Sequence, residues 1–165
     1  MQSPTPDREV IVLTWKPEIN PDFKEKDFDA LATSCWRNGH VDVHWRFLSD
    51  RFHPNDPVVV LRQGKEPGLI AVGLLLSLEP ATDSAADRSL KGLVRLTKMR
   101  DSHEHPLFSK RELLEIGFRK SVLETQASGS LSLLPEEKVS FEAALAEKFS
   151  INLFGGNSGR LSRDS

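Results

Sequence analysis

Apolar residues of this chain fall into short runs separated by polar segments, and the spacing within the runs predicts several strands. Val10–Trp15 is an almost continuous run of β-prone residues, which indicates a buried strand. Val41–Phe47 alternates apolar and polar residues, the period-two pattern of a strand with one buried face. Gly73, inside another apolar run, predicts a bulge or a place where a second backbone or a ligand comes close. Three more runs predict strands: Val58–Leu61, Leu69–Leu78 and Val94–Met99.

A different spacing predicts the first helix, from about Lys26 to Asn38. Phe28, Leu31 and Cys35 recur at steps of three and four residues and make one apolar stripe. Gly39 follows, where a left-handed C-terminal cap is favoured. We therefore expect the only cysteine to be a small core residue rather than a reactive group.

Two further helices are predicted from their N-terminal signals. Ser109 and Glu112 have the spacing of a capping box and predict a short helix that ends near Gly117. Pro135 stands at the first position of the last helix and is followed by two glutamates. Four residues of this helix are expected to face the core: Val139, Phe141, Leu145 and Phe149.

Together these elements predict an α+β domain with a curved, mostly antiparallel sheet or small barrel of about five or six strands and about three helices. Residues 1–8 are rich in proline and polar residues and are expected to be disordered. The predicted domain covers residues 9–150. Residues 151–165 resemble a flexible linker in composition, which predicts a missing C-terminal domain after them.

Composition narrows the classes of function. The chain has 165 residues, a single cysteine and five histidines that show no metal-ligand spacing, so we expect no metal, no cofactor and no redox chemistry. It has no apolar run of transmembrane length and no signal peptide, which predicts a cytoplasmic protein away from membranes. The formal net charge is −2, but residues 91–120 carry eight basic against four acidic residues. This segment predicts a local basic face, unless it is an ordinary solvated surface.

Sequence signals for catalysis are weak. The chain has neither a phosphate-binding glycine loop nor a Gly-x-Ser-x-Gly elbow. His103, Glu104 and His105 leave a minor hypothesis of a hydrolase or nucleotide-processing enzyme.

Tryptophans give a stronger signal. Trp15 and Trp45 each lie near a strand end and are followed by Lys16 and Arg46. An aromatic face beside a cation can stack a nucleobase and bind its phosphate, although both indoles could equally be core residues. Trp36, at the end of the first helix, is interpreted as a cover on the edge of the core.

Several segments, in this order, resemble the EVE domain of the PUA-like superfamily, in the form found ahead of HNH nucleases. They are Val12–Pro17, Trp45, Phe52–Pro67, Gly68–Gly73, Ser77–Pro80 and Gln126–Gly129. The resemblance implies a PUA-like fold and a module that binds double-stranded DNA containing 5-methyl- or 5-hydroxymethylcytosine. The modified base would be flipped into an aromatic pocket, where stacking and edge hydrogen bonds repay the cost of unstacking.

The resemblance also implies which residues would act. Trp45 would be the wall of the pocket, and Glu79 would accept a hydrogen bond from the cytosine amino group. The other expected pocket residues are Thr14, Trp15, Lys16 and Ser49. The expected DNA contacts are Arg46, Arg51, Arg62, Lys65, Arg95, Lys98, Arg100, Gln126, Ser128 and Gly129.

In this hypothesis the chain is the specificity domain of a modification-dependent restriction endonuclease. It has no nuclease motif itself, and its partners would be modified DNA, a C-terminal nuclease domain and possible further copies in a homodimer. Two alternatives to DNA recognition stay open besides the hydrolase. One is a reader of modified or structured RNA, judged by its 2′-hydroxyl, and the other is a protein-interaction module without a ligand pocket.

Overall fold

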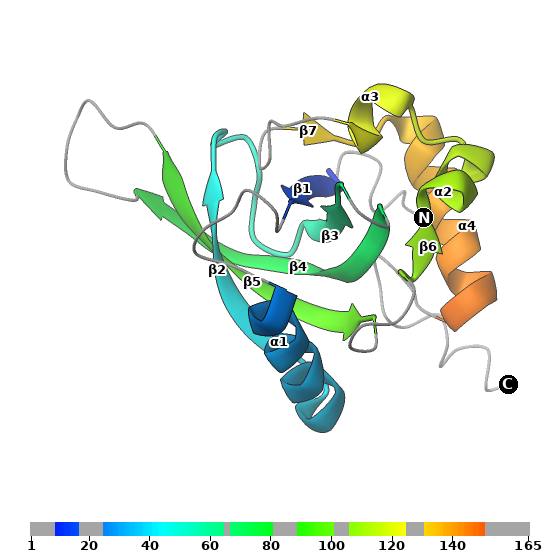
Figure 1. Ribbon diagram of the computed structural model, residues 1–165. Helices are drawn as coiled ribbons and strands as arrows, with labels where there is room; N and C mark the ends of the chain where they lie inside the picture. Colours follow the sequence, from blue (N-terminus) through cyan, green and yellow to red (C-terminus); the bar gives the residue numbers. More distant parts are fainter. Residues whose placement is uncertain are drawn as a thin grey trace, which may run out of the picture.

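The computed structural model describes residues 9–16, 25–64, 67–80, 89–100, 106–124 and 131–150, and these form one sheet of seven strands with four helices (Figure 1). The predicted α+β class is confirmed. The strands are β1 (Ile11–Trp15), β2 (Val41–Phe47), β3 (Pro57–Arg62), β4 (Gly68–Pro80), β5 (Leu90–Met99), β6 (Phe108–Ser109) and β7 (Leu131–Ser132). The helices are α1 (Glu25–Asn38), α2 (Lys110–Ile116), α3 (Lys120–Leu123) and α4 (Pro135–Phe149).

The sheet is mixed and open, so the alternative of a small barrel is wrong. Its strand order is β2-β5-β4-β3-β1-β7, and β6 pairs with β4. β1 and β3 are parallel, while the other neighbours are antiparallel. β2 and β7 end the order on opposite sides and therefore do not close the sheet. The two strands beyond the predicted count, β6 and β7, have only two residues each, which is too short for a periodic pattern.

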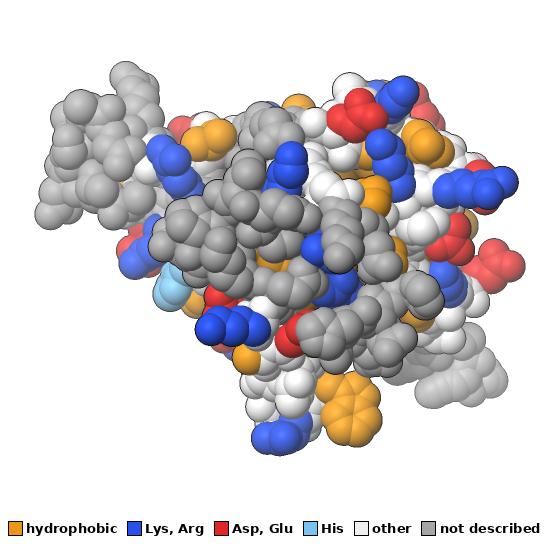
Figure 2. Space-filling model, viewed as in Figure 1, with side chains coloured by type: hydrophobic (Ala, Val, Ile, Leu, Met, Phe, Trp, Pro, Cys, Tyr) orange, Lys and Arg blue, Asp and Glu red, His pale blue; other side chains and the backbone are white. Residues whose placement is uncertain are grey.

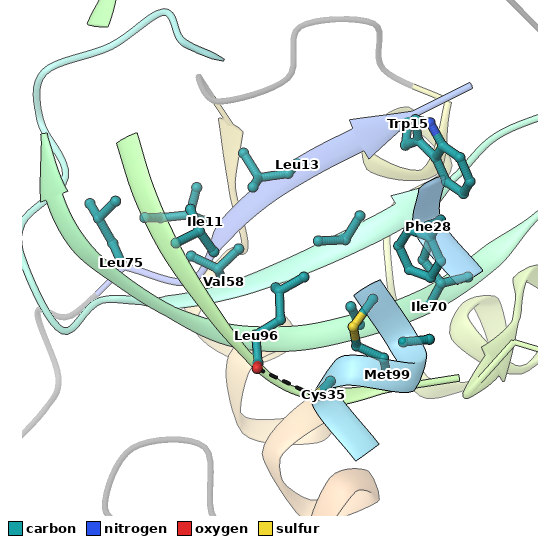
Figure 3. Packing of buried hydrophobic residues seen from close by; sticks show 14 of the residues in the cluster. Ile11, Leu13, Trp15, Phe28, Cys35, Val58, Ile70, Leu75, Leu96 and Met99 are labelled. Carbon is teal, nitrogen blue, oxygen red and sulfur yellow. Dashed lines mark hydrogen bonds between the residues drawn. The ribbon is translucent and has the colours of Figure 1, made fainter. Parts of the chain in front are cut away.

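The sheet buries apolar residues on both faces, and the alternation along β1 and β3 shows how. Leu13 and Val60 belong to the core cluster under α1, which also contains Phe28 and Cys35 (Figure 3). Val59 and other alternate residues belong to a second cluster, which includes buried residues of α2, α3 and α4. Strands buried on both faces lose the polar alternation of a half-exposed strand, which explains their continuous apolar runs.

β4 and β5 are the longest strands and form a curved hairpin, with β2 running alongside β5 (Figure 1). The pairing register shifts between Val72 and Gly73 and again between Leu75 and Ser77, as bulges do. At Gly73 a Cβ atom would collide with the carbonyl oxygen of Arg95. The predicted bulge and the predicted close approach of a second backbone are therefore both present.

Helix ends follow the predicted signals closely. Ser109 and Glu112 exchange the two hydrogen bonds of a capping box, at 3.1 and 2.8 Å, and Gly117 caps the C-terminus of α2. In α4 the prediction fails at one residue, because Val139 is 69% exposed.

No helix of the described residues is long and apolar enough to cross a membrane. The predicted disordered start, residues 1–8, and the predicted linker, residues 151–165, lie outside the described residues.

Candidate functional site

A shallow pocket of about 320 Å³ lies where the end of β2 meets the start of β5. This volume is at the lower end of the roughly 300–1,000 Å³ typical of small-ligand sites. Antiparallel pairing makes the pocket, since it brings residues more than 40 positions apart in the chain side by side. The lining residues are His44, Trp45, Arg46, Ser89, Leu90 and Lys91.

Trp45 is the aromatic residue of this pocket. Its side chain is half-buried and packs against the core cluster under α1, so the indole is anchored while part of it faces the pocket. The residue directly opposite on β5 is Gly92, and the ring of Phe47 occupies the space that a side chain at Gly92 would need. The indole is therefore held by packing against the core and also contributes to the pocket lining.

Two cations, Arg46 and Lys91, belong to the same pocket lining, although neighbours along a strand direct their side chains to opposite faces. Arg46 and Lys91 are directly opposite each other across β2 and β5, and both are exposed. Like charges directly opposite in a sheet are destabilising, and an anion bound between them would relieve the repulsion. Glu79 is opposite Lys91 on β4, which places this expected pocket residue beside the pocket but not in its lining.

Trp15 has a different position, and the expectation that it borders an open pocket is corrected. It is only 1% exposed and stacks on Phe28 with ring centroids 4.8 Å apart and planes inclined by 16° (Figure 3). Arg62 lies 5.6 Å from the ring of Trp15, and Arg100 lies 5.4 Å from the ring of Phe28. These four residues form a buried column of two stacked rings between two guanidinium groups.

Both arginines of the column are inside the protein, so the prediction that they contact DNA is wrong for this structure. Arg62 is 7% exposed and Arg100 is 2% exposed. One end of the column approaches a carboxylate, since Arg100 Nη2 lies 3.9 Å from Asp29 Oδ1. Attraction to the faces of aromatic rings strengthens when water is excluded, which favours a structural role for both cations.

The two tryptophans lie at opposite ends of the sheet and cannot share one pocket. Trp45 is level with Leu78 of β4 through Gly92, whereas Trp15 is level with Gly68 of β4 through Arg62. Ten residues of β4 separate the two levels, a path of roughly 33 Å along an extended strand. Thr14 and Lys16 adjoin Trp15, and Ser49 follows the end of β2 outside the pocket lining.

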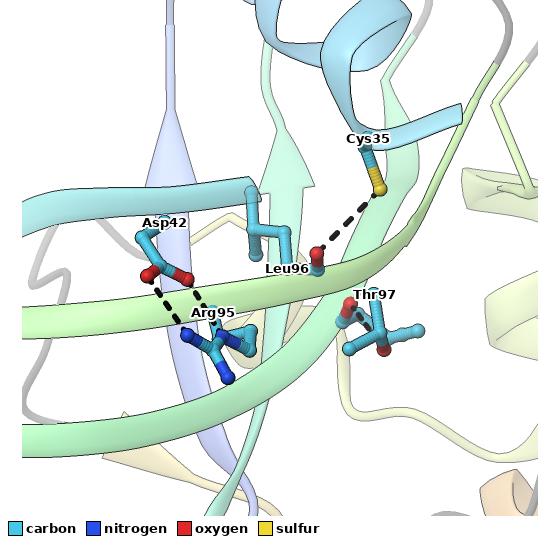
Figure 4. Close-up of polar contacts among 6 residues, drawn as sticks. Cys35, Asp42, Arg95, Leu96 and Thr97 are labelled. Atoms are coloured by element: carbon cyan, nitrogen blue, oxygen red, sulfur yellow. Dashed lines mark hydrogen bonds and ion pairs between the residues drawn. The ribbon is translucent and has the colours of Figure 1, made fainter. Parts of the chain in front are cut away.

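The predicted basic face is largely neutralised in the structure. Arg95 binds Asp42 through two hydrogen bonds of 2.8 and 3.0 Å, and this hydrogen bonding lowers the pKa of the Asp42 carboxyl (Figure 4). Lys110 pairs with Glu124 at 3.0 Å. Figure 2 accordingly shows Lys and Arg side chains interspersed with Asp and Glu over the visible face.

The remaining predicted DNA contacts divide into described and undescribed residues. Arg51 hydrogen-bonds to Ser132 at 3.1 Å and lies over the ring of Phe52, and Lys98 lies 5.0 Å from the ring of Phe149. Lys65, Gln126, Ser128 and Gly129 lie outside the described residues, as do His103, Glu104 and His105. Within the described residues, no cluster of three or more His, Cys, Asp or Glu side chains could hold a metal ion.

Trp36 does not cover the core as predicted, because it is 83% exposed on α1.

Four pocket residues were absent from the sequence prediction: His44, Ser89, Leu90 and Lys91. His44 belongs to the strand alternation around Trp45, and Lys91 is the first residue of the basic segment 91–120, whereas no sequence signal indicated Ser89 or Leu90. Comparisons with protein-family models, with curated proteins and with solved structures found no match to this chain.

Proposed function

We propose that this chain is a nucleic-acid-binding module that accepts one extrahelical base in the pocket beside Trp45. The observation that carries the proposal is the half-buried indole of Trp45 with Arg46 and Lys91 in the same pocket lining. A base stacks on the part of the indole that lines the pocket, and the two cations contact the neighbouring phosphates. The described residues offer no metal cluster, and the pocket itself needs none to bind a base.

The energies are compatible with base flipping. Extruding a base from a duplex costs a few kcal/mol, and least for a base whose pairing is already weakened. Stacking on an aromatic side chain returns roughly 1–3 kcal/mol per base, and contacts to phosphate add sequence-independent affinity. Stacking on a single indole therefore offsets most of the free energy needed to extrude the base, and hydrogen bonds to the base edge must supply the rest.

The resemblance to EVE domains indicates which ligand to propose. We propose double-stranded DNA containing 5-methyl- or 5-hydroxymethylcytosine, read by a PUA-like domain that directs a nuclease domain in a modification-dependent restriction endonuclease. Glu79, opposite Lys91 on β4, is the one carboxylate among the expected site residues and is proposed to accept a hydrogen bond from the cytosine amino group. The cytoplasm is the proposed compartment, supported by the composition of the sequence.

The test is a fluorescence-anisotropy titration of the chain against labelled duplexes that differ only in one cytosine: plain, 5-methylated or 5-hydroxymethylated. We expect tighter binding to a modified duplex. Trp45→Ala should lose this preference and should bind the modified duplex roughly 5- to 150-fold more weakly, the equivalent of one lost stacking contact.

Trp36→Ala is the matched control, because it removes an indole that is 83% exposed on α1 and absent from the pocket lining. It should bind like the unmodified protein. Equal affinities for all three duplexes would reject the recognition of modified cytosine. Tighter binding to an RNA of the same sequence would replace DNA by RNA as the ligand, since the 2′-hydroxyl distinguishes the two.

A further inference from the structure

β2 is the outer strand on its side of the described sheet. It pairs with β5 through all seven of its residues, Val41 to Phe47, and no other described strand lies beyond it. The outward backbone groups of an edge strand form a template for pairing with another chain, and natural sequences commonly guard such edges with inward charges, prolines or bulges. β2 contains neither a proline nor a register shift in its pairing with β5.

The sequence of β2 is complementary to itself about its central residue. When two copies of β2 run antiparallel with His44 opposite His44, Asp42 of each copy faces Arg46 of the other. On the other face Val43 meets Trp45, and Val41 meets Phe47. We propose that two copies of this chain pair along β2 and form one continuous sheet across a two-fold axis, an isologous contact of the kind most homodimers use.

Charge complementarity favours a second copy of the chain as the partner that binds this edge. Within one chain Arg46 is opposite Lys91, a like-charge pair that costs stability, whereas across the dimer axis it faces a carboxylate. Asp42 already accepts two hydrogen bonds from Arg95, and a carboxylate has acceptor sites for a second guanidinium. Each two-fold dimer contains two such arginine–aspartate contacts.

This dimer is compatible with ligand binding in the pocket but does not depend on it. A guanidinium has five N–H donors, so Arg46 can contact Asp42 of the second copy and a phosphate together. The apolar contacts place Trp45 against Val43 of the second copy, which supports the indole from the edge. The proposal therefore concerns the chain alone and is tested without nucleic acid.

Sedimentation velocity over a range of protein concentrations, with no nucleic acid present, measures the assembly. We expect a concentration-dependent dimer. Arg46→Asp places Asp opposite Asp, and Asp42→Arg places Arg opposite Arg, so each variant alone should sediment as a monomer. In an equimolar mixture both contacts become arginine opposite aspartate, and a heterodimer should form.

Arg111→Asp is the control, because Arg111 is 88% exposed on α2 and should leave the dimer unchanged. Circular dichroism melting shows that each variant is folded, which matters for Asp42→Arg because Asp42 also binds Arg95. A chain that stays monomeric at all concentrations overturns the proposal. Dimers that persist in both single variants, or variants that stay monomeric when mixed, also overturn it.

Discussion

At the scale of the residue, two glycines show how closely β5 fits against its two neighbours, β4 and β2. Gly73 lies against the backbone of Arg95, and Gly92 lies under the ring of Phe47. A side chain at either position would need space that another group already occupies. Neither Gly73 nor Gly92 has a positive φ angle, so close contact rather than backbone freedom explains both glycines.

Gly73→Ala is expected to destabilise the fold by roughly 1–3 kcal/mol, the usual cost of inserting a methyl group into filled space. The obstacle is backbone, which cannot rotate away as a flexible side chain would. Urea unfolding measures the change in the free energy of unfolding. Ser77→Ala on the same strand removes atoms instead of adding them and should change stability by less than about 0.5 kcal/mol. Equal stability of Gly73→Ala and the unmodified chain would contradict the close contact.

The two strand tryptophans show what sequence-based prediction of the site could not distinguish. Trp15 and Trp45 have the same local pattern, a strand-end indole followed by a cation. Stacking by Phe28 buries Trp15, whereas Trp45 is on an outer strand beside a glycine. These differences come from α1 and β5, which the local sequence around each tryptophan does not contain.

At the scale of the element, local signals predicted helices and strands well and their pairing poorly. The capping box at Ser109 and the proline at Pro135 fixed two helix starts because these contacts span only a few residues. The parallel pairing of β1 with β3 is non-local, and nothing in either run indicates its partner. The ion pairs of Arg95 and Lys110 are non-local as well, which is why a segment with a charge of +4 did not become a basic face.

The side chain of Glu137 holds helix α4 in place. It is 2% exposed and accepts hydrogen bonds from the backbone N–H of Leu134 at 2.7 Å, from the backbone N–H of Arg119 at 2.7 Å and from Arg119 Nε at 3.1 Å. One carboxylate thereby caps α4 and ties it to the segment that precedes α3.

Glu137→Ala is expected to cost about 3 kcal/mol, the low end for breaking a buried pair, because Arg119 remains 38% exposed and can reach water. Urea unfolding monitored by circular dichroism gives the value. Glu136→Ala removes the exposed neighbour in the same helical turn and should cost less than about 1 kcal/mol, through the helix dipole alone. A similar loss for both variants would mean that charge at the helix start, rather than these hydrogen bonds, is what matters.

At the scale of the whole molecule, the distribution of charge limits how this protein can bind a polyanion. Arg62 and Arg100 are buried, and Arg95 is paired with Asp42. Arg46 and Lys91 are exposed and form no ion pair within the described residues. Binding to nucleic acid should therefore depend on a few cations around one pocket rather than on a broad basic surface.

Salt dependence of DNA binding tests this distribution. Each phosphate that a protein neutralises contributes about −0.9 to the slope of log K against log salt for duplex DNA, so Lys91→Gln should reduce the magnitude of the slope by about that amount. Arg111→Gln, on α2 and paired with Glu115 at 3.7 Å, should leave the slope unchanged because α2 packs at the Gly68 end of β4, away from the pocket. Anisotropy titrations at several salt concentrations give both slopes. If both variants reduced the slope equally, DNA would be bound over the general surface, since only a localised contact makes Lys91 differ from another exposed cation.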